Sequence, residues 1–499
     1  MGGIMMTMDD VMKKLKVRDA DLVIYERSYT QYQHCQLQMI RLNKEKYIVI
    51  IGNGELKDQL EGELNDGYKL CPLTHHNRLV LNKYFEFTKP MAFGHKGATI
   101  GLGDRLGLAS SGHIQAIVDK RIHPVLAQQS IRELNLMDRT YADVLDAACF
   151  AVFQEGYTGG FGADGDHLKK EDDIQKSIEL GISMLTLDCT DYIDERFSET
   201  TEAIIRAGFM ELSQEKRSYY ESKYLDQTFN IEGTALHFNE IKLMKNSLIY
   251  GKAIEYMEYI YRTYIQTADR AIDFEISIDE TMTPTTPEAH FFIANELYQH
   301  SIEVNSMAPR FIGEFQKAID YIGDLNAFEE TLIVHAQIAD YFGYKLSIHS
   351  GSDKFRVFSL IGKHTHGRFH VKTAGTNWLE AVRLVAQENP ALYRKMHIYA
   401  LEHFHEAKQY YHVTTDIHAI QDIHQVSDID LPAYMDDDNA RQLLHITYGL
   451  LLQAKDQNQN FMFKNAFYRT LVENEDKYAQ GLIKHIGKHI AYLGIKEKE

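Results

Sequence analysis

The sequence has few cysteines, and they are not arranged for cross-linking. Its 499 residues include four, Cys35, Cys71, Cys149 and Cys189, which form neither a CxxC pair nor a spacing typical of metal ligands. A disulfide framework is therefore not expected, and the composition favours the reducing cytoplasm as the location of the protein.

Long apolar runs and basic blocks are missing as well. No stretch approaches the roughly 20 apolar residues that a membrane-spanning helix needs. The formal net charge is -18, and no cluster of lysine and arginine is suited to follow a phosphate backbone. We therefore expect a small-molecule partner, and neither a membrane nor a nucleic acid. The sequence is compatible with a homo-oligomer.

What the sequence does have is the composition of a globular protein with a large core, 44% hydrophobic and 25% charged. Residues 1–90 contain β-branched and aromatic runs such as "CQLQMIRL" and "YIVIIG", which predict a small N-terminal β-containing domain. Residues 91–460 alternate short apolar strands with helical stretches, a pattern that favours parallel strands covered by helices. Residues 461–499 indicate a C-terminal helical extension.

Eight candidate strands with helices between them predict the fold of the central region. They are residues 97–103, 160–167, 183–189, 273–279, 303–310, 345–351, 368–375 and 442–449. Eight strands with interposed helices are what a TIM (β/α)8 barrel requires, so the predicted class is α/β with this barrel. Residues 197–266 are helical in composition, and we expect them to form an insertion that serves as a lid, an oligomer contact or a solvated hairpin.

The carboxyl ends of the strands form the functional face of such a barrel, so the last inward-facing residues are informative. Alternation in "KLSIHSG" directs His349 inward, and alternation in "RFHVKTAG" directs His370 and Lys372 inward. In "DFEISIDE", the same alternation directs Glu275 and Asp279 inward. The ends of these three strands are therefore expected to carry polar groups at the barrel mouth.

Two further strand ends are expected to add carboxylates and a third imidazole to that volume. "SMLTLDC" directs Asp188 inward, and the glycine-rich "GADGDH" places Asp164, Asp166 and His167 at the end of its strand. Burying this many ionisable groups is costly unless they are paired, neutralised or bound to a metal.

These histidines suggest a metal site. Imidazoles from His167, His349 and His370, with a carboxylate such as Glu314, suit zinc or another divalent transition metal, and Mn, Co, Ni and Fe also accept such ligands. The alternative for each histidine is an ordinary hydrogen-bonded core or surface position. Arg310, one helical turn before Glu314, either grips a substrate carboxylate or forms a surface ion pair with that residue.

"GLGDRLG" (101–107) has the spacing GxGxxxG, which differs from the dinucleotide fingerprint GxGxxG. A nicotinamide site is therefore not expected. We expect instead that Gly101 and Gly103 allow the backbone to approach a ligand, with Asp104 and Arg105 in the first loop.

Several long motifs resemble the tagaturonate epimerase family. They are "FGHKGATIGLGDRLGLASSGH", "GFGADGDHLK", "DETMTPTTPEAHFFIANEL", "MAPRFIGEFQKAIDYIGD", "SIHSGSDKF" and "FHVKTAGTNWLEA", which together span roughly residues 90–380. The resemblance implies a divalent-metal-dependent enzyme that interconverts D-tagaturonate and D-fructuronate at C4. It implies His167, Glu314 and His349 as metal ligands and Asp166 and Glu275 as acid–base groups.

The chemistry of this epimerisation favours cleavage of a carbon–carbon bond. In a 2-keto-hexuronate the hydrogen on C4 is not acidified, so direct deprotonation there is difficult. Retro-aldol cleavage of C3–C4 is easier, because a base such as Asp166 takes the C4 hydroxyl proton while a metal acts as Lewis acid. Lys372 is expected to polarise an oxygen or balance charge, with a Schiff base as the alternative. The residues expected to contact the uronate are Arg310, Lys354, His370 and Asn377.

The same residues are compatible with two other functions. A metal-dependent ketose–aldose isomerase needs the same residue types at a barrel mouth, but it moves hydrogen between C1 and C2. A non-catalytic sugar-acid binding protein would need the pocket without a general base.

Overall fold

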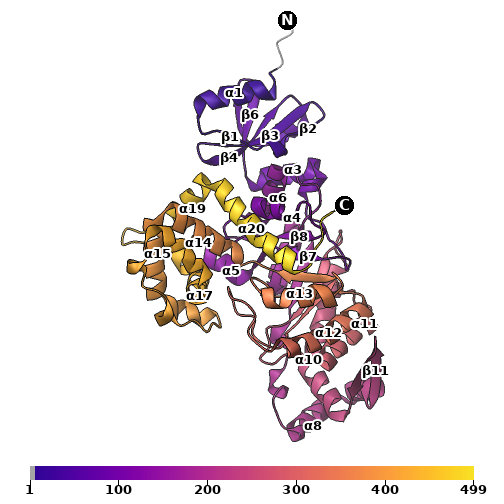
Figure 1. The fold of residues 1–499 in the computed structure, drawn as a ribbon. Helices are drawn as coiled ribbons and strands as arrows, with labels where there is room; N and C mark the ends of the chain where they lie inside the picture. Colours follow the sequence, from indigo (N-terminus) through magenta and orange to yellow (C-terminus); the bar gives the residue numbers. More distant parts are fainter. Residues whose placement is uncertain (1–5, 499) are drawn as a thin grey trace.

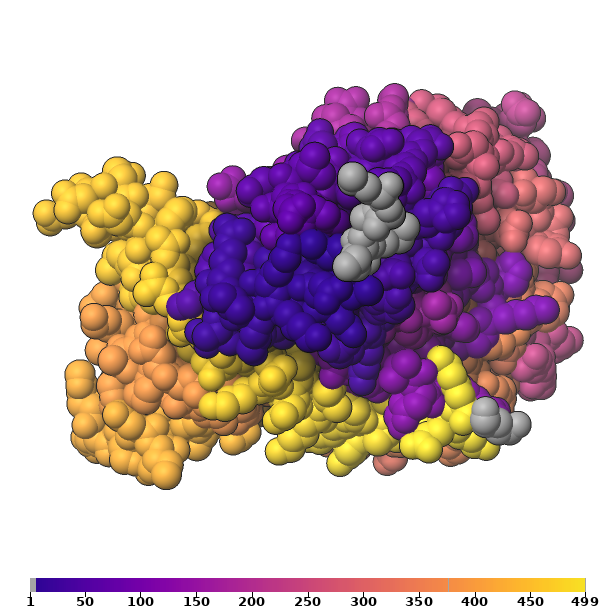
Figure 2. Space-filling view, turned by 90° about the horizontal axis from the view of Figure 1, so that it is seen from above, coloured from indigo at the N-terminus to yellow at the C-terminus, as the bar shows by residue number. Residues whose placement is uncertain are grey.

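The computed structural model describes residues 6–498, which form an N-terminal sheet, a barrel and a C-terminal set of helices (Figure 1). The N-terminal sheet lies at one end of the molecule, and the C-terminal helices lie beside the barrel. Seen from above, these helices project to one side of the body (Figure 2).

The N-terminal domain is an antiparallel sheet of order β1-β3-β4-β6-β5, with β2 paired to β3. Its strands are β1 (Val23–Ile24), β2 (Thr30–Tyr32), β3 (Cys35–Leu42), β4 (Glu45–Ile51), β5 (Glu63–Asn65) and β6 (Tyr68–Pro72). Alternate residues of β4 face opposite sides: Ile48 and Ile50 join one core, and Val49 and Ile51 join the other. α1 (Met8–Arg18) supplies apolar residues to the second core, and α3 (His75–Tyr84) supplies them to the first.

Eight parallel strands close the barrel, which confirms the predicted fold class. Their order is β10-β13-β14-β15-β16-β7-β8-β9. The strands are β7 (Thr99–Gly101), β8 (His123–Ser130), β9 (Gly162–Leu168), β10 (Met184–Asp188), β13 (Asp273–Ile278), β14 (Ser306–Pro309), β15 (Lys345–Ile348) and β16 (Phe369–Lys372).

One of the eight predicted strands is wrong. Residues 442–449 belong to α17 (Asp438–Ile446) and α18 (Tyr448–Gln453), because Asp437 caps α17 by accepting a hydrogen bond from the backbone N–H of Ala440. The missing strand is β8, whose second residue, Pro124, argues against a strand when the sequence is read alone. All eight barrel strands therefore lie between Thr99 and Lys372.

Helices cover the outside of the barrel between successive strands. They are α4 (Ser110–Ile117), α6 (Tyr141–Glu155), α7 (Glu171–Leu180), α10 (Glu240–Ile260), α11 (Pro287–Gln299), α12 (Leu325–Phe342) and α13 (Phe355–His364). The short helix α5 (Ile131–Met137) follows β8 directly and lies at the barrel mouth. Apolar residues of these helices and of the strands share one hydrophobic core, so the barrel and its helices are one packed unit.

The segment between β10 and β13 carries extra structure, as expected. It contains α8 (Glu202–Glu211), α9 (Gln214–Tyr224), the hairpin β11 (Gln227–Ile231) and β12 (Thr234–Phe238), and then α10. The hairpin was not predicted. Its Phe229 and Phe238 pack on Phe291 of α11, so the hairpin is attached to the barrel's outer helices rather than solvated on all sides.

The chain after β16 forms what we call the C-terminal helical region, residues 376–492. Besides α17 and α18 it contains α14 (Thr376–Glu388), α15 (Pro390–Glu402), α16 (Phe404–Ala407), α19 (Lys464–Glu473) and α20 (Glu475–Tyr492). These helices share a second core around the single tryptophan, Trp378, which donates a hydrogen bond to the carbonyl of Leu444. None of the helices described is both long and apolar enough for a membrane span.

Candidate active site

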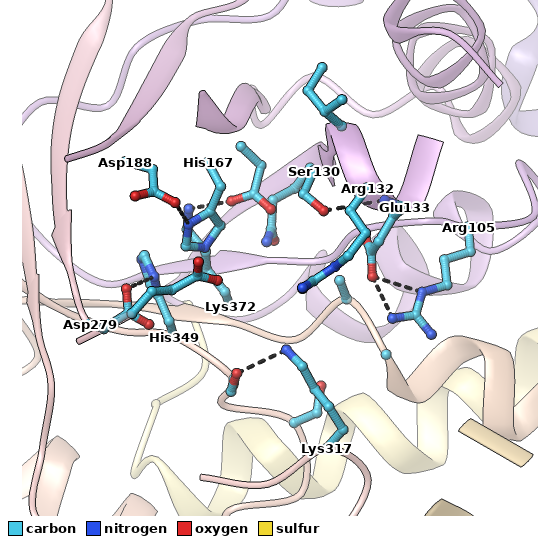
Figure 3. Close-up of a pocket in the computed structure, with 18 of the residues that line it drawn as sticks. Arg105, Ser130, Arg132, Glu133, His167, Asp188, Asp279, Lys317, His349 and Lys372 are labelled. Carbon is cyan, nitrogen blue, oxygen red and sulfur yellow. Dashed lines mark hydrogen bonds and ion pairs between the residues drawn. The ribbon is translucent and has the colours of Figure 1, made fainter. Parts of the chain in front are cut away.

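A cavity of about 370 Å³ opens at the carboxyl ends of the barrel strands (Figure 3). Its two ends differ in chemistry. One end, which we call the histidine end, contains His167, Asp188, Asp279, His349 and Lys372. The other, which we call the basic end, contains Arg105, Arg132, Glu133 and Lys317.

His349 follows β15 directly and is held between two carboxylates. Its Nδ1 lies 3.0 Å from Asp279 Oδ1, and its Nε2 lies 2.8 Å from Glu275 Oε1. Burial alone would lower the pKa of His349, but the two carboxylates outweigh burial and raise this pKa to about 10. The histidine that follows this strand therefore reaches the centre of the barrel mouth, where carboxylates lie on both sides of its ring.

Lys372, the last residue of β16, is enclosed by three carboxylates. Its Nζ donates to Asp164 Oδ2 at 2.9 Å and to Asp166 Oδ1 at 2.6 Å, and it lies 2.9 Å from Glu275 Oε1. Burial alone would lower the pKa of Lys372, but the carboxylates outweigh burial and raise it well above its usual value. The lysine is therefore a charged counter-ion.

The same contacts give Asp164 and Asp166 different pKa values. Burial raises the pKa of Asp164 to about 6. Burial also acts to raise the pKa of Asp166, but Lys372 and His167 outweigh it and hold this pKa below its usual range. Asp166 is therefore ionised at neutral pH, and it lines the cavity.

His167 reaches the cavity from an unusual backbone position at the end of β9. Its φ of 53° is in the left-handed region, and the register between β9 and β10 shifts next to it. Its ring lies 4.8 Å from that of His349, centre to centre. Its Nδ1 is buried without a hydrogen-bond partner among the described residues, 3.7 Å from Asp188 Oδ2.

These residues fit a divalent transition metal. Ligand atoms of His167, Asp279 and His349, one from each residue, lie within 4.8 Å of one another. Two imidazoles and a carboxylate form a donor set used by zinc and by other divalent transition metals, and three protein ligands leave a position for substrate. The Nδ1 of His167, which is buried and has no hydrogen-bond partner among the described residues, also suits a bound cation.

The structure brings His167 and His349 together as predicted, but it places Glu314 elsewhere. Glu314 is not in this ligand group: its side chain is 45% exposed, lies 3.7 Å from His412 and lines a neighbouring pocket that also contains Asp279 and His349. Asp279 takes the position that was expected for Glu314. The alternation of its strand directed Asp279 inward, and that signal was available in the sequence.

Glu275 and His370 lie below the cavity rather than on its wall. Glu275 is fully buried and accepts hydrogen bonds from Thr186 and Ser306 besides its contact to His349. His370 Nδ1 lies 2.9 Å from Thr99 Oγ1, and burial lowers the pKa of His370 to about 3. Both side chains point into the barrel, as alternation predicts, one layer beneath the mouth.

Three other predicted substrate contacts are engaged in holding loops or line another pocket. Lys354 Nζ donates to the carbonyls of Gln316, Ile319 and Ser352. Asn377 donates its side-chain N–H to the carbonyl of Gly103. Arg310 lines the same neighbouring pocket as Glu314.

The first two glycines of "GLGDRLG" allow close packing of the backbone. A Cβ on Gly101 would lie 2.0 Å from Gln128 Oε1, and a Cβ on Gly103 would lie 2.2 Å from the Gln128 carbonyl. These glycines therefore let β7 and the residues after it approach β8. Approach of a ligand to this backbone stays a prediction, and both Gln128 and the nearby Arg105 line the cavity. Asp104 accepts four backbone N–H groups of the following loop.

The basic end was not predicted from the sequence. Arg105 donates two hydrogen bonds to Glu133 and lies over the ring of Tyr448, 4.1 Å from its centroid. Lys317 donates to Ser350 Oγ at 2.9 Å. These residues come from loops and from α5, so strand alternation gives no signal for them.

Comparison with known proteins identifies the family. The family model for tagaturonate epimerase, UxaE, matches residues 25–493. The chain belongs to the tagaturonate epimerase family. This result confirms the resemblance found in the sequence and places the chain in a family of carbohydrate epimerases, within the isomerase class.

Two relatives cover nearly the whole chain. A tagaturonate/fructuronate epimerase from Thermotoga maritima is 38% identical over 478 residues, which are 94% of this chain and 96% of the relative. The native crystal structure of fructuronate-tagaturonate epimerase UxaE from Cohnella laeviribosi is 57% identical, with a TM-score of 0.95, and the match covers 98% of this chain and 100% of that one. A structure of the same enzyme with one glycerol gives the same values.

Proposed function

We propose that this chain interconverts D-tagaturonate and D-fructuronate by inverting C4, in a cytoplasmic reaction that depends on a divalent metal ion. The observation that carries the proposal is the grouping of His167, Asp279 and His349 at the barrel mouth, beside an ionised Asp166. Membership of the epimerase family and the activities named for its relatives support the substrate pair. Four buried, free cysteines agree with a reducing compartment.

The inversion proceeds through cleavage and re-formation of the C3–C4 bond. Asp166 accepts the proton of the C4 hydroxyl, the C3–C4 electron pair moves toward the C2 carbonyl, and C4 becomes an aldehyde carbon. The aldehyde fragment turns to present its other face, the enediolate carbon C3 re-attacks, and Asp166 returns the proton to the C4 oxygen. Atoms and electrons balance without an external oxidant or reductant.

Positive groups at the site would stabilise the negative charge of the enediolate and of the ionised Asp166. His167, Asp279 and His349 would hold the metal, which supplies Lewis acidity when bound. Lys372 neutralises the carboxylates beneath the mouth, so that an ionised Asp166 is tolerated in a buried setting. Its three ion pairs make Lys372 unsuited to a Schiff base, which requires an uncharged amine.

Glu275 positions other groups in this proposal. It accepts from His349 and contacts Lys372 while lying outside the cavity wall, so it fixes the orientation of the ring. Direct proton transfer to substrate is assigned to Asp166, which lines the cavity.

The test uses protein treated with a chelator and reloaded with single divalent metals. D-Fructuronate is followed by proton NMR in deuterated water. Metal-dependent formation of D-tagaturonate without deuterium at C4 is the expected result, and Asp166→Asn should remove it. Deuterium at C1 with an aldose product would indicate the isomerase instead. Binding of the sugar acid without turnover under any metal would indicate a binding protein.

A further inference from the structure

The basic end of the cavity contains two cations that have no acidic partner. Arg105 is neutralised by Glu133. Neither Lys317 nor Arg132 forms an ion pair within residues 6–498. Arg132 is exposed and lies over the ring of Tyr411, 5.1 Å from its centroid, while Lys317 is half-buried. Glu133 and Glu280 also line the cavity, but neither forms an ion pair with Lys317 or Arg132 among the described residues. Two adjacent cations that are not paired in this way are suited to bind an anion.

Lys317 is fixed in place, as a residue that recognises a ligand needs to be. Besides its bond to Ser350, its own carbonyl accepts from Gln442 Nε2 at 3.2 Å. The next residue, Ala318, has a φ of 67° and its carbonyl accepts from Arg441 Nε at 2.8 Å. A left-handed non-glycine backbone is maintained only where surrounding contacts hold it, and α17 supplies those contacts here.

Holding Lys317 there has an electrostatic cost. Burial lowers its pKa, and the nearby Arg132 lowers it further, with Glu133 acting in the opposite direction. An anion bound between Lys317 and Arg132 would relieve this cost. The same cavity reaches from these cations to His349, since Lys317 contacts Ser350 and Ser350 follows His349 in the chain.

We infer that Lys317 and Arg132 bind the C6 carboxylate of the substrate and thereby select hexuronates over neutral ketoses. This inference rests on the proposed function. In a 2-keto-hexuronate the carboxylate is at the opposite end of the carbon chain from the ketone, which matches the separation of the basic and histidine ends (Figure 3). After C3–C4 cleavage the carboxylate is on the aldehyde fragment, so the same contacts retain this fragment while it turns.

The alternative residue for this task is Arg310, and the structure disfavours it. Arg310 does not line the cavity that contains His167 and Asp166. It lines a neighbouring pocket of about 270 Å³, which shares Arg132, Lys317, Asp279 and His349 with that cavity. Its backbone N–H donates to Thr285 Oγ1, which fixes the backbone of this segment. Arg310 and Lys317 therefore offer a direct experimental comparison.

The experiment compares Lys317→Met with Arg310→Met in metal-loaded, full-length protein. For D-fructuronate, we expect Lys317→Met to lower kcat/KM by about 10- to 100-fold, mainly through KM, as for a lost charge-assisted hydrogen bond. D-Fructose carries CH2OH in place of the carboxylate, so its kcat/KM should change less than about threefold. Arg310→Met should leave the preference for the uronate unchanged, and Lys317→Arg should restore part of it.

Competitive inhibition gives a second measurement that does not require turnover of a neutral sugar. D-Glycerate should inhibit the wild-type protein, and this inhibition should weaken in Lys317→Met by the same factor as uronate binding. Equal losses on both sugars, unchanged inhibition by D-glycerate, or a selective uronate defect in Arg310→Met would each overturn the inference. Failure of the wild-type protein to epimerise D-fructuronate would instead overturn the proposed function.

Discussion

The two ends of the cavity are built in different ways. At the histidine end, every side chain that faces the cavity stands at or just beyond the end of a barrel strand: His167 on β9, Asp188 on β10, Asp279 after β13, His349 after β15 and Lys372 on β16. At the basic end, Arg105 and Lys317 lie in loops, and Arg132 and Glu133 lie in α5. Groups proposed for the reaction thus stand on the rigid strands, and groups proposed for substrate selection stand on connecting segments.

The basic end depends on a part of the chain that is distant in sequence. Tyr448 of α18 lies beneath Arg105, and Arg441 and Gln442 of α17 hold the segment that carries Lys317. The C-terminal helical region therefore supports one end of the cavity. This division predicts that damage to the strand ends affects all substrates, whereas damage to the helical support affects the uronate selectively.

The largest expected effect is at the histidine end. Replacing His167 by Asn removes one proposed metal ligand but keeps a residue that tolerates a left-handed backbone. We expect kcat/KM to fall by about 10³-fold for both D-fructuronate and D-fructose, because the change removes a group needed in the reaction itself. Steady-state kinetics and metal content per chain measure the effect.

His366→Asn is the matched control for that variant. His366 also has a left-handed backbone, with a φ of 52°, but it is exposed and does not line the cavity. Its activity and metal content should equal those of the wild type. Wild-type metal content in His167→Asn would contradict the assignment of His167 as a ligand.

A change inside the basic end should mainly affect stability. Glu133→Gln leaves the buried Arg105 without its carboxylate, and removing one partner of a buried ion pair costs about 3 kcal/mol of unfolding free energy. Urea denaturation at neutral pH measures the loss. Glu329→Gln breaks a more exposed set of contacts, with Lys363 and His364, and should cost much less. Equal losses in both variants would mean that Arg105 is not held mainly by Glu133.

The difference between the two ends also explains what the sequence could predict. Alternation along a strand fixes the direction of each side chain, so His349, Lys372, Glu275 and Asp279 were correctly directed inward. Alternation does not give depth, so it could not show that Glu275 lies beneath the cavity wall. The acid–base role of Glu275 was implied by the family resemblance alone. Long motifs also identified the family, because they extend through most strand ends of the barrel.

Loop and long-range contacts gave no comparable signal. Lys354 was expected to hold substrate, but three carbonyls surround its ammonium group, an arrangement that depends on two separate loops meeting. The apolar run at 442–449 resembles a strand by composition, and only packing against Trp378 and its neighbours identifies it as helix. Tertiary contacts of this kind override local propensity.

Acid should destabilise the C-terminal helical region through a buried histidine. His397 on α15, a helix that packs against α17, is buried, its Nε2 has no hydrogen-bond partner among the described residues, and burial lowers its pKa to about 4. The folded form thus binds a proton less readily than the unfolded form, whose pKa is 6.5. This contribution to stability is complete above pH 6.5 and falls as the pH falls toward 4, by about 2 kcal/mol between pH 6.5 and 5.0.

His397→Leu tests this explanation. The variant should lose less unfolding free energy than the wild type between pH 7.5 and 5.0, as measured by urea denaturation at each pH. His412→Leu is the control, because the His412 side chain is 75% exposed. A wild-type pH dependence in His397→Leu would show that other groups cause the acid sensitivity.

The smallest effect that we predict concerns Gln442, through which the C-terminal helical region supports the basic end alone. Gln442 Nε2 donates to Gln316 Oε1 at 3.0 Å and to the Lys317 carbonyl at 3.2 Å, without lining the cavity itself. Gln442→Leu should therefore loosen the segment that carries Lys317 and raise KM for D-fructuronate by about fivefold, which corresponds to the loss of about 1 kcal/mol. The kcat for D-fructose should not change, because the strand ends are unaffected.

Gln453→Leu, in the neighbouring helix α18, is the control and should match the wild type on both sugars. If Gln442→Leu instead lowered kcat equally for both, the helical region would support the whole barrel mouth, and the two ends would not be separable.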